Sequence, residues 1–276
     1  IQNDQKILIC GNFNYIDGVT IDKIARLNVN GSLDTTFNIG AGANHVVRCM
    51  AIQQDNKIVI GGEFTTFNGT LINRIARLNT DGSLDTTFQP GLGANNTVHS
   101  LSIQNDEKII VSGEFLDYNG VYKRHIIRIN TDGSLDTTFR NGTATGPSNT
   151  VYSTKILSDG KIIIGGAFTS YDVISRLRLA KLNTDGTLDT TFNQSGGCNG
   201  DIRSLSIQSD GKIIFGGNFN AYNGTLFHRI GRVDSLGNVD PSFIPITATG
   251  TPVYSTSVQS DGKIIMGGQF YTLNGI

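Results

Sequence analysis

The sequence predicts an all-β protein built from repeated antiparallel sheets, and three observations support this prediction. The stretch SDGKIIIGGAFTSY, which begins at Ser158, recurs almost unchanged from Ser209 and from Ser260. A glycine two residues before a phenylalanine recurs from Gly11 onward, at steps of 51, 51, 53, 51 and 51 residues. Each repeat is filled with runs of strand length and strand composition, and no run has a helical period.

Each repeat contains four pieces of strand length. In the copy over 98–149, VHSLSIQ alternates apolar and polar residues, KIIVSGEF is a β-branched run, HIIRIN alternates again, and LDTTF is a short fourth piece. NDE or SDG separates the first two pieces, and TDGS separates the last two. Because Asp-Gly and Asn-Gly tolerate the positive φ of tight hairpin turns, we expect neighbouring strands to be antiparallel.

Four antiparallel strands in each repeat of about 51 residues are typical of a β-propeller blade. We predict one propeller domain over 1–276 with six blades, the last of them incomplete; seven blades are an alternative. The expected blades cover approximately 1–45, 46–97, 98–150, 151–201, 202–252 and 253–276. Both ends fall inside a repeat, so we interpret the chain as part of a longer protein. A β-solenoid is the alternative fold, but it favours shorter parallel repeats without two hairpin turns.

Repeated phenylalanines and glycines indicate where the blades pack. The Gly-Gly pair lacks side chains, which suits close approach of two sheets. The phenylalanine of each GGxF motif and that of each LDTTF motif are expected to fill the space between blades. The first set is Phe13, Phe64, Phe115, Phe168, Phe219 and Phe270, and the second is Phe37, Phe88, Phe139, Phe192 and Phe243.

The combined pattern DGKIIIGGxF, YNG, RIARLN and DGSLDTTF resembles the delta-60 repeat β-propeller family over the whole chain. This resemblance implies the propeller fold. It also implies a place among bacterial secreted or surface proteins, or among phage tail-associated proteins. It implies no catalytic residues.

Composition excludes several classes of function. The net charge is −1 and only 16% of the residues are charged, which leaves no basic surface for nucleic acid. No apolar run approaches the roughly 20 residues that span a bilayer, so no membrane insertion is expected. The three cysteines, Cys10, Cys49 and Cys198, offer no disulfide framework or metal-binding spacing, and we expect no cofactor.

The motif NTDGSLD, at Asn79–Asp85 and in other repeats, has spacing like the second part of a calcium-binding loop. However, Arg77 occupies the place of the first ligand, where a cation would repel Ca²⁺. We therefore expect an Asx-type turn and an ion pair between the arginine and the LDTTF aspartate. Cation binding by these turns is the alternative.

The connections between strands suggest two different surfaces. The first-to-second and third-to-fourth turns are short and nearly identical, whereas the second-to-third and blade-to-blade loops vary. Variable loops on a rigid scaffold often carry function. The candidate ligand-binding residues on them are Tyr15, Tyr118, Tyr122, Lys123, Arg124, Tyr171, Tyr222, Phe227 and His228. The alternative is that one column of these residues caps the blade core; that column is Ile16, Phe67, Tyr118, Tyr171, Tyr222 and Leu273.

These observations favour a non-enzymatic binding module of an extracellular, cell-surface or virion protein, possessing no catalytic residues. Its expected partner is a protein or a surface glycan, and it could belong to a larger assembly. One alternative is a purely structural spacer. Another is a hydrolase or lyase with its site at the central channel. The inner strands argue against an enzyme, because their readable channel-side positions are Ser, Thr, Gln and Cys rather than Glu, His or Lys.

Overall fold

The computed structural model describes residues 1–140, 145–193, 196–243 and 248–273. Every helix or strand element assigned in these ranges is a β-strand. The chain divides into two compact units, Ile1–Asp136 and Thr137–Ile276, which are described separately. Within the described ranges, no helix is long and apolar enough to cross a membrane. The prediction of a single continuous domain stays a prediction.

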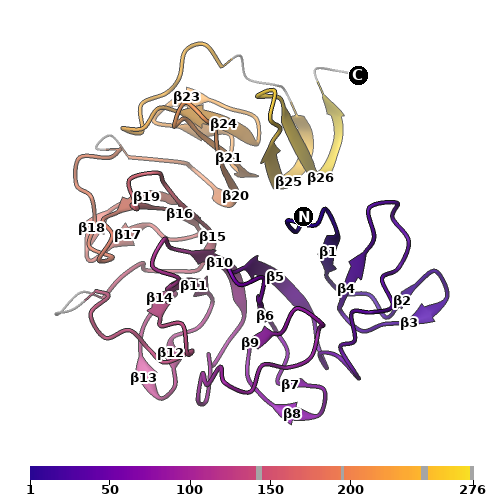
Figure 1. Ribbon diagram of the computed structural model, residues 1–276. Coiled ribbons are helices and arrows are strands. Elements are labelled where there is room, and N and C mark those ends of the chain that lie inside the picture. The colour runs from indigo at the N-terminus through magenta and orange to yellow at the C-terminus, as the bar shows by residue number, and fades with distance from the viewer. Residues whose placement is uncertain (141–144, 194–195, 244–247, 274–276) are drawn as a thin grey trace. The chain divides into compact units, whose positions relative to one another are not determined.

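Each of the three repeats in the first unit contributes one main antiparallel sheet (Figure 1). These sheets are β1 (Ile7–Cys10) with β4 (Ile24–Leu27); β5 (Val47–Ile52), β6 (Ile58–Gly62) and β9 (Ile75–Leu78); and β10 (Val98–Ile103), β11 (Ile109–Gly113) and β14 (Ile126–Ile129). In the second and third sheets the middle strand is the β-branched run that ends in Gly61-Gly62 or in Ser112-Gly113. All five residues of β6 and of β11 are buried.

The second unit repeats the same arrangement. Its sheets are β15 (Val151–Ile156), β16 (Ile162–Gly166) and β19 (Leu179–Leu182); β20 (Asp201–Ile207), β21 (Ile213–Asn218) and β24 (Ile230–Val233); and β25 (Ala248–Val258) with β26 (Ile264–Leu273). The first strands of the six main sheets begin at Ile7, Val47, Val98, Val151, Asp201 and Ala248.

The second-to-third connections are small hairpins rather than open loops. They are β2 (Tyr15–Ile16) with β3 (Val19–Thr20), β7 (Thr66–Phe67) with β8 (Thr70–Leu71), β12 (Asp117–Tyr118) with β13 (Val121–Tyr122), β17 (Ser170–Tyr171) with β18 (Ile174–Ser175), and β22 (Ala221–Tyr222) with β23 (Thr225–Leu226). Asn68 and Gly69 have φ of 46° and 76°, as the mirror-image turns of two-residue hairpins require. Figure 1 shows β7–β8 and β12–β13 at the outer margin of the first unit.

The predicted fourth strand is reduced to a single antiparallel bridge in each of five repeats. The bridges are Leu27–Leu33, Leu78–Leu84, Ile129–Leu135, Leu182–Leu188 and Val233–Val239. The strand ends there because the next residue starts a turn. Asp85 Oδ1 accepts hydrogen bonds from the backbone N of Thr87 at 3.0 Å and from its Oγ1 at 2.6 Å.

The glycines and phenylalanines pack as predicted. A Cβ on Gly62 would lie 2.2 Å from the carbonyl oxygen of Val46, and one on Gly61 would lie 2.6 Å from Val98 of the next sheet. The GGxF phenylalanines Phe64, Phe115, Phe168 and Phe219 are at most 1% exposed, and the LDTTF phenylalanines from Phe37 to Phe192 are also buried. The terminal members of the two sets, Phe13, Phe243 and Phe270, are half-buried.

Linking segments and hairpins meet, as the two-surface prediction expects. Ala43, in the segment that links the first two repeats, forms a bridge with Phe67 of the next hairpin. The Asn44 side chain accepts hydrogen bonds from the backbone N of Thr65 at 2.8 Å and of Thr66 at 3.0 Å. The variable segments of neighbouring repeats therefore form a joint surface within a unit.

Candidate functional site

Two of the predicted ligand-binding residues stand on the surface of the first unit. Tyr15 on β2 is 67% exposed and Tyr122 on β13 is 63% exposed. Lys123 and Arg124 follow Tyr122 and are half-buried. The Arg124 guanidinium carbon lies 6.0 Å from the centroid of the Tyr122 ring. An exposed aromatic ring with a cation beside it is a reasonable contact point for a partner.

Three predicted tyrosines belong to the core instead, and we correct their assignment. Tyr118, Tyr171 and Tyr222 are fully buried. Their hydroxyls donate hydrogen bonds to the carbonyl oxygens of Gly133 at 2.8 Å, Gly186 at 2.5 Å and Gly237 at 2.7 Å. The burial raises their pKa values. The core-column alternative therefore holds for these three and for Phe67, while the side chain of Leu273 lies outside the described residues.

Phe227 is a further correction. It is 1% exposed, and its ring centroid lies 6.3 Å from that of Phe215 in an edge-on arrangement. Ile72 occupies the same repeat position and is 8% exposed, so a comparison of the repeats could have identified this as a core position. His228 is half-buried.

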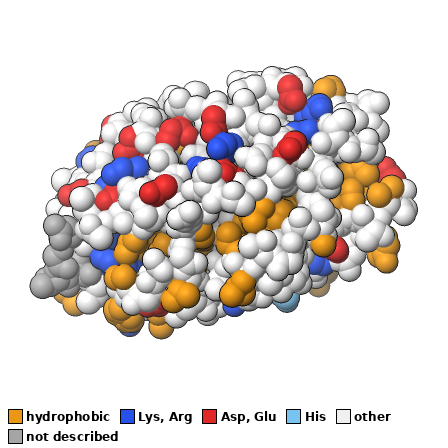
Figure 2. Space-filling view, turned by 60° about the horizontal axis from the view of Figure 1, so that its bottom comes forward, with side chains coloured by type: hydrophobic (Ala, Val, Ile, Leu, Met, Phe, Trp, Pro, Cys, Tyr) orange, Lys and Arg blue, Asp and Glu red, His pale blue; other side chains and the backbone are white. Residues whose placement is uncertain are grey.

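Exposed large apolar residues recur at one repeat position of the hairpins, and of these the sequence analysis identified Tyr122 but missed Leu71 and Leu226. Leu71, Tyr122 and Leu226 are 77%, 63% and 66% exposed. At the preceding repeat position, Val121 and Ile174 are also exposed. On the face drawn in Figure 2, hydrophobic side chains gather in patches that lie mostly apart from the charged ones. The missed signal is the apolar residue directly after Asn-Gly-Thr or Asn-Gly-Val.

Histidine–glutamate pairs lie where β5 and β10 begin. His45 Nδ1 is 3.0 Å from Glu63 Oε2, and Arg48 Nε donates to Glu63 Oε1 at 2.5 Å. In the next repeat, His99 Nε2 is 3.0 Å from Glu114 Oε1. Both glutamates directly follow the Gly-Gly position, so they are variable residues within an otherwise constant motif. Such pairs can bind polar ligands, but each glutamate already has its cationic or histidine partner.

The residues on the inner strands provide no evidence for or against catalysis. Ser204 Oγ and Thr256 Oγ1 are 2.9 Å apart, and both residues are buried between β20 and β25, so they do not line open space. Lys155 on β15 takes the place that Ser102 has in the preceding repeat. Part of the Lys155 side chain stays exposed, but the protein around its amine lowers the Lys155 pKa.

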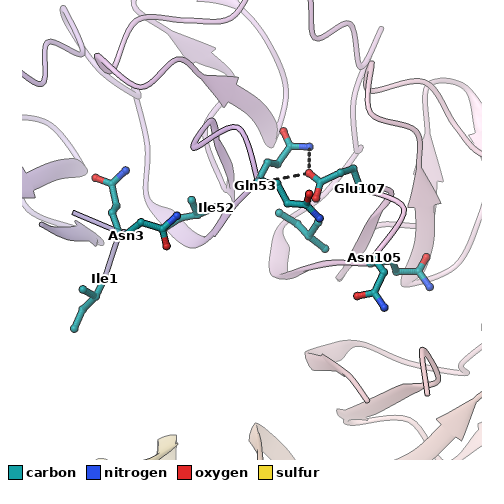
Figure 3. Close-up of a pocket in the computed structure, with 10 residues that line it drawn as sticks. Ile1, Asn3, Ile52, Gln53, Asn105 and Glu107 are labelled. Carbon is teal, nitrogen blue, oxygen red and sulfur yellow. Dashed lines mark hydrogen bonds between the residues drawn. The ribbon is translucent and has the colours of Figure 1, made fainter. Parts of the chain in front are cut away.

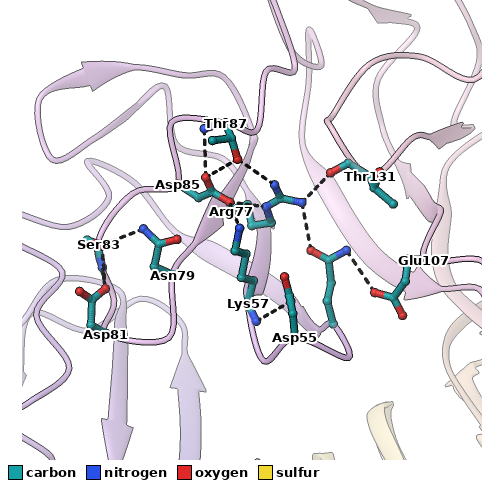
Figure 4. Close-up of polar contacts among 11 residues, drawn as sticks. Asp55, Lys57, Arg77, Asn79, Asp81, Ser83, Asp85, Thr87, Glu107 and Thr131 are labelled. Atoms are coloured by element: carbon teal, nitrogen blue, oxygen red, sulfur yellow. Dashed lines mark hydrogen bonds and ion pairs between the residues drawn. The ribbon is translucent and has the colours of Figure 1, made fainter.

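The third-to-fourth turns carry an ion cluster in every complete repeat (Figure 4). In the second repeat, Asp85 Oδ2 lies 2.7 Å from Arg77 Nε and 2.9 Å from Lys57 Nζ. Arg77 also donates to the carbonyl oxygen of Thr131 in the next repeat at 2.5 Å. Burial acts to raise the Asp85 pKa, but hydrogen bonds from Thr87 and Lys57 outweigh it and hold that pKa well below its usual range.

These contacts support the turn interpretation of the NTDGSLD motif over cation binding. Asp81 Oδ1 accepts from the backbone N of Ser83 at 2.9 Å and from its Oγ at 2.7 Å, which is an Asx turn. Asn79 donates to Ser83 Oγ at 2.9 Å. Asp85, the last acidic residue of the motif, is already bound by two cationic side chains. Among the described residues, no group of three His, Cys, Asp or Glu is placed to hold a metal ion.

The cysteines behave as small fillers within the structure. Burial raises the pKa of the Cys10 thiol to about 11, and it also raises the pKa values of Cys49 and Cys198. Cys49 Sγ lies 3.9 Å from the carbonyl oxygen of Val98 in the next repeat. All three thiols are free.

A cavity of about 390 Å³ opens at the ends of the first strands of the first unit (Figure 3). It is lined by three equivalent triplets, one from each repeat, namely 1–3, 52–54 and 103–105, together with Glu107. Figure 3 shows Gln53 and Glu107 directed toward one another in its wall, with Asn3 to one side and Asn105 to the other. This cavity was not anticipated from sequence, because its residues are separated by a full repeat.

Repeated antiparallel sheets, joined by hairpin turns and packed through glycine and phenylalanine, define a β-propeller. A family model described as "Domain of unknown function (DUF5122) beta-propeller" matches residues 2–37, 53–88, 104–139, 157–192, 208–243 and 259–276. The chain belongs to this β-propeller family. Among curated proteins, none matches it.

Solved structures support the fold. The WD40 β-propeller domain of Doa1 is 14% identical with a TM-score of 0.60, over 88% of this chain and 68% of that one. The extracellular domain of the putative one-component system BT4673 from B. thetaiotaomicron is 18% identical with a TM-score of 0.50. That match covers 94% of this chain but only 31% of the neighbour. At these identities the likeness concerns the fold alone.

Proposed function

We propose that this chain is a non-enzymatic interaction module that binds a protein partner through its hairpins, in an extracellular, cell-surface or virion protein. The observation that carries the proposal is the exposure of Leu71, Tyr122 and Leu226 at one repeat position. Large apolar side chains held on rigid hairpins are typical of contact surfaces between proteins. Tyr122, with Arg124 beside it, combines two of the residue types that are enriched at binding hot spots.

The resemblance of the repeats to the delta-60 family supports the proposed location. BT4673 supplies an extracellular domain with the same fold, but its identity of 18% limits that likeness to the fold. The repeated ion clusters support a structural role for the third-to-fourth turns, not a role in binding the partner. Each cluster joins residues of its own repeat and, through Arg77 to Thr131 for example, reaches the next.

The proposal is tested by cross-linking mass spectrometry in the cells or particles that carry this protein. The variant Leu71→Ser/Tyr122→Ser/Leu226→Ser is compared with Val29→Ser, a matched control in which a residue 69% exposed on a third-to-fourth turn is changed. We expect the hairpin variant to lose at least ten-fold of its cross-linked partner and the control to lose none. Partners that remain equally abundant in both variants would instead support the structural-spacer alternative.

A further inference from the structure

The amide-lined cavity of the first unit has a composition that distinguishes it from the equivalent positions of the second. At one repeat position just after the first strand, the first three repeats carry Asn3, Gln54 and Asn105, whereas the next three carry Ser158, Ser209 and Ser260. Three of the six amides that line the cavity thus come from a position that the later repeats fill with serine. The other three, Gln2, Gln53 and Gln104, correspond to Leu157, Gln208 and Gln259. Residues that break a strong repeat pattern in one place call for a local explanation.

One acceptor in the wall has no partner. In the second and third repeats, the equivalent glutamines are satisfied: Gln53 Oε1 and Gln104 Oε1 each accept from an arginine at 3.3 Å. Gln2 is 7% exposed, yet its Oε1 accepts no hydrogen bond within the described residues. The equivalent arginine, Arg26, donates to the carbonyl oxygen of Thr80 at 2.6 Å, as Arg77 does to that of Thr131, but it does not donate to Gln2 Oε1. A buried acceptor without a donor is costly, and a ligand hydroxyl would satisfy it.

Glu107 supplies the carboxylate of the lining. Its φ is 63°, in the left-handed region, as are those of Gln5 and Asn56 at the same repeat position, 66° and 63°. The later repeats have Gly160, Gly211 and Gly262 there. A side chain there strains the backbone, and such strain is found more often at functional positions than elsewhere. Glu107 Oε2 accepts from Gln53 Nε2 at 3.3 Å and from the backbone N of Gln54 at 3.4 Å. The carboxylate is therefore held at the wall of the cavity by the preceding repeat.

The lining selects the chemical class of the ligand. It offers amide donors and acceptors, one carboxylate and three isoleucines, and it contains no cationic side chain. Anions would lack a counter-charge, and an apolar ligand would leave the amides unsatisfied. Alternating hydroxyl and C–H groups would match both the amides and the isoleucine side chains. The volume falls within the roughly 300–1,000 Å³ of small-molecule sites.

We propose that this cavity binds a neutral carbohydrate of one or two sugar rings. The Gln2 carbonyl and the Glu107 carboxylate accept hydrogen bonds from its hydroxyls. The amides of Asn3, Gln54 and Asn105 both donate and accept. This site is separate from the hairpin surface, and the proposal for it does not depend on the proposed function of the hairpins.

The test is ligand-detected NMR and isothermal titration of the full chain against a panel of neutral and acidic mono- and disaccharides. Gln54→Ser/Asn105→Ser installs the serine that the later repeats carry, so the fold should tolerate it. Gln259→Ser is the control, because Gln259 is an exposed amide of the second unit, at the repeat position that Gln53 and Gln104 occupy in the first. A circular dichroism melt checks that all three proteins are equally folded.

We expect saturable binding of at least one neutral sugar, a loss of at least ten-fold in affinity in the double variant, and no change in the control. A uronic acid should bind more weakly than its neutral counterpart, and the difference should shrink when Glu107 is changed to Gln. The proposal is overturned if no sugar binds in a saturable manner. It is also overturned if the double variant binds as well as the control.

Discussion

Tyr118 on β12 donates its hydroxyl to the carbonyl oxygen of Gly133 at 2.8 Å, and this bond ties the hairpin of the third repeat to its third-to-fourth turn. The hairpin thereby folds down over its own sheet. Tyr122, four residues later, points away and stays exposed. Two tyrosines of the same hairpin thus have opposite roles, one in stability and one on the surface.

The first prediction concerns this bond. Tyr118→Phe should lower the free energy of unfolding by about 1 kcal/mol, because it leaves a buried carbonyl oxygen without its donor. Urea denaturation followed by tyrosine fluorescence or circular dichroism measures the change. Tyr122→Phe is the control and should have no effect. Equal stabilities of the two variants would contradict the role assigned to Tyr118.

The second prediction concerns the ion cluster of the second repeat, where a substitution should destabilise the protein more than Tyr118→Phe does. Asp85→Asn removes the negative charge shared by Arg77 and Lys57, and leaves a largely buried guanidinium without its partner. The expected loss is about 3 kcal/mol or more. Asp55→Asn, which changes an exposed aspartate but keeps the acceptor for the Lys57 backbone N, should cost little. The comparison is made by urea denaturation at neutral pH.

The same clusters determine how stability responds to acid. The pKa of Asp85 in the folded protein lies well below its ordinary value of 3.8, so folding favours the ionised form. Its contribution is complete above the ordinary pKa and is lost as the pH falls below 3.8 toward the folded-state value. Asp34, Asp189 and Asp240 behave alike. Melting temperatures should therefore fall steeply below about pH 4, and less steeply in Asp85→Asn.

The charge of Lys155 is expected to destabilise the folded protein, whereas the charge of Asp85 stabilises it. The Lys155 side chain is exposed, but the protein around its amine removes part of the hydration and lowers its pKa in the folded state. The charged amine therefore destabilises the fold at neutral pH, and this penalty disappears as the pH rises above the ordinary pKa of 10.5. Lys155→Ser should raise the melting temperature at pH 7 and give a smaller gain near pH 10. A stability loss at pH 7 would show that Lys155 makes a favourable contact that outweighs this loss of hydration.

The β17–β18 hairpin contains a strained residue. Val173 has a φ of 66° and is 91% exposed, at the position where the other four hairpins have glycine. A β-branched residue is unfavourable in this conformation. Val173→Gly should therefore stabilise the protein by about 1 kcal/mol, measured by thermal or urea unfolding. Gly69→Val in the β7–β8 hairpin should produce the reverse change.

Local signals determined much of this protein from sequence alone. The period of the repeat, the Asp-Gly and Asn-Gly turns and the β-branched runs each act over a few residues, so they predicted the strands, the hairpins and the β-propeller class. The pairing of Arg77 with Asp85 was also predictable, because both belong to one repeat and recur at a constant spacing.

Contacts between segments decided the rest. The burial of Tyr118 and the exposure of Tyr122 depend on which way a small hairpin folds over its sheet, and residue type alone does not specify this direction. The fourth strand shrank to one bridge because Asp85 forms a turn with Thr87. The amide cavity brings Gln2, Gln53 and Gln104 together from three repeats. Sequence determined the repeated unit, whereas tertiary packing decided which of its unrepeated residues meet and which reach solvent.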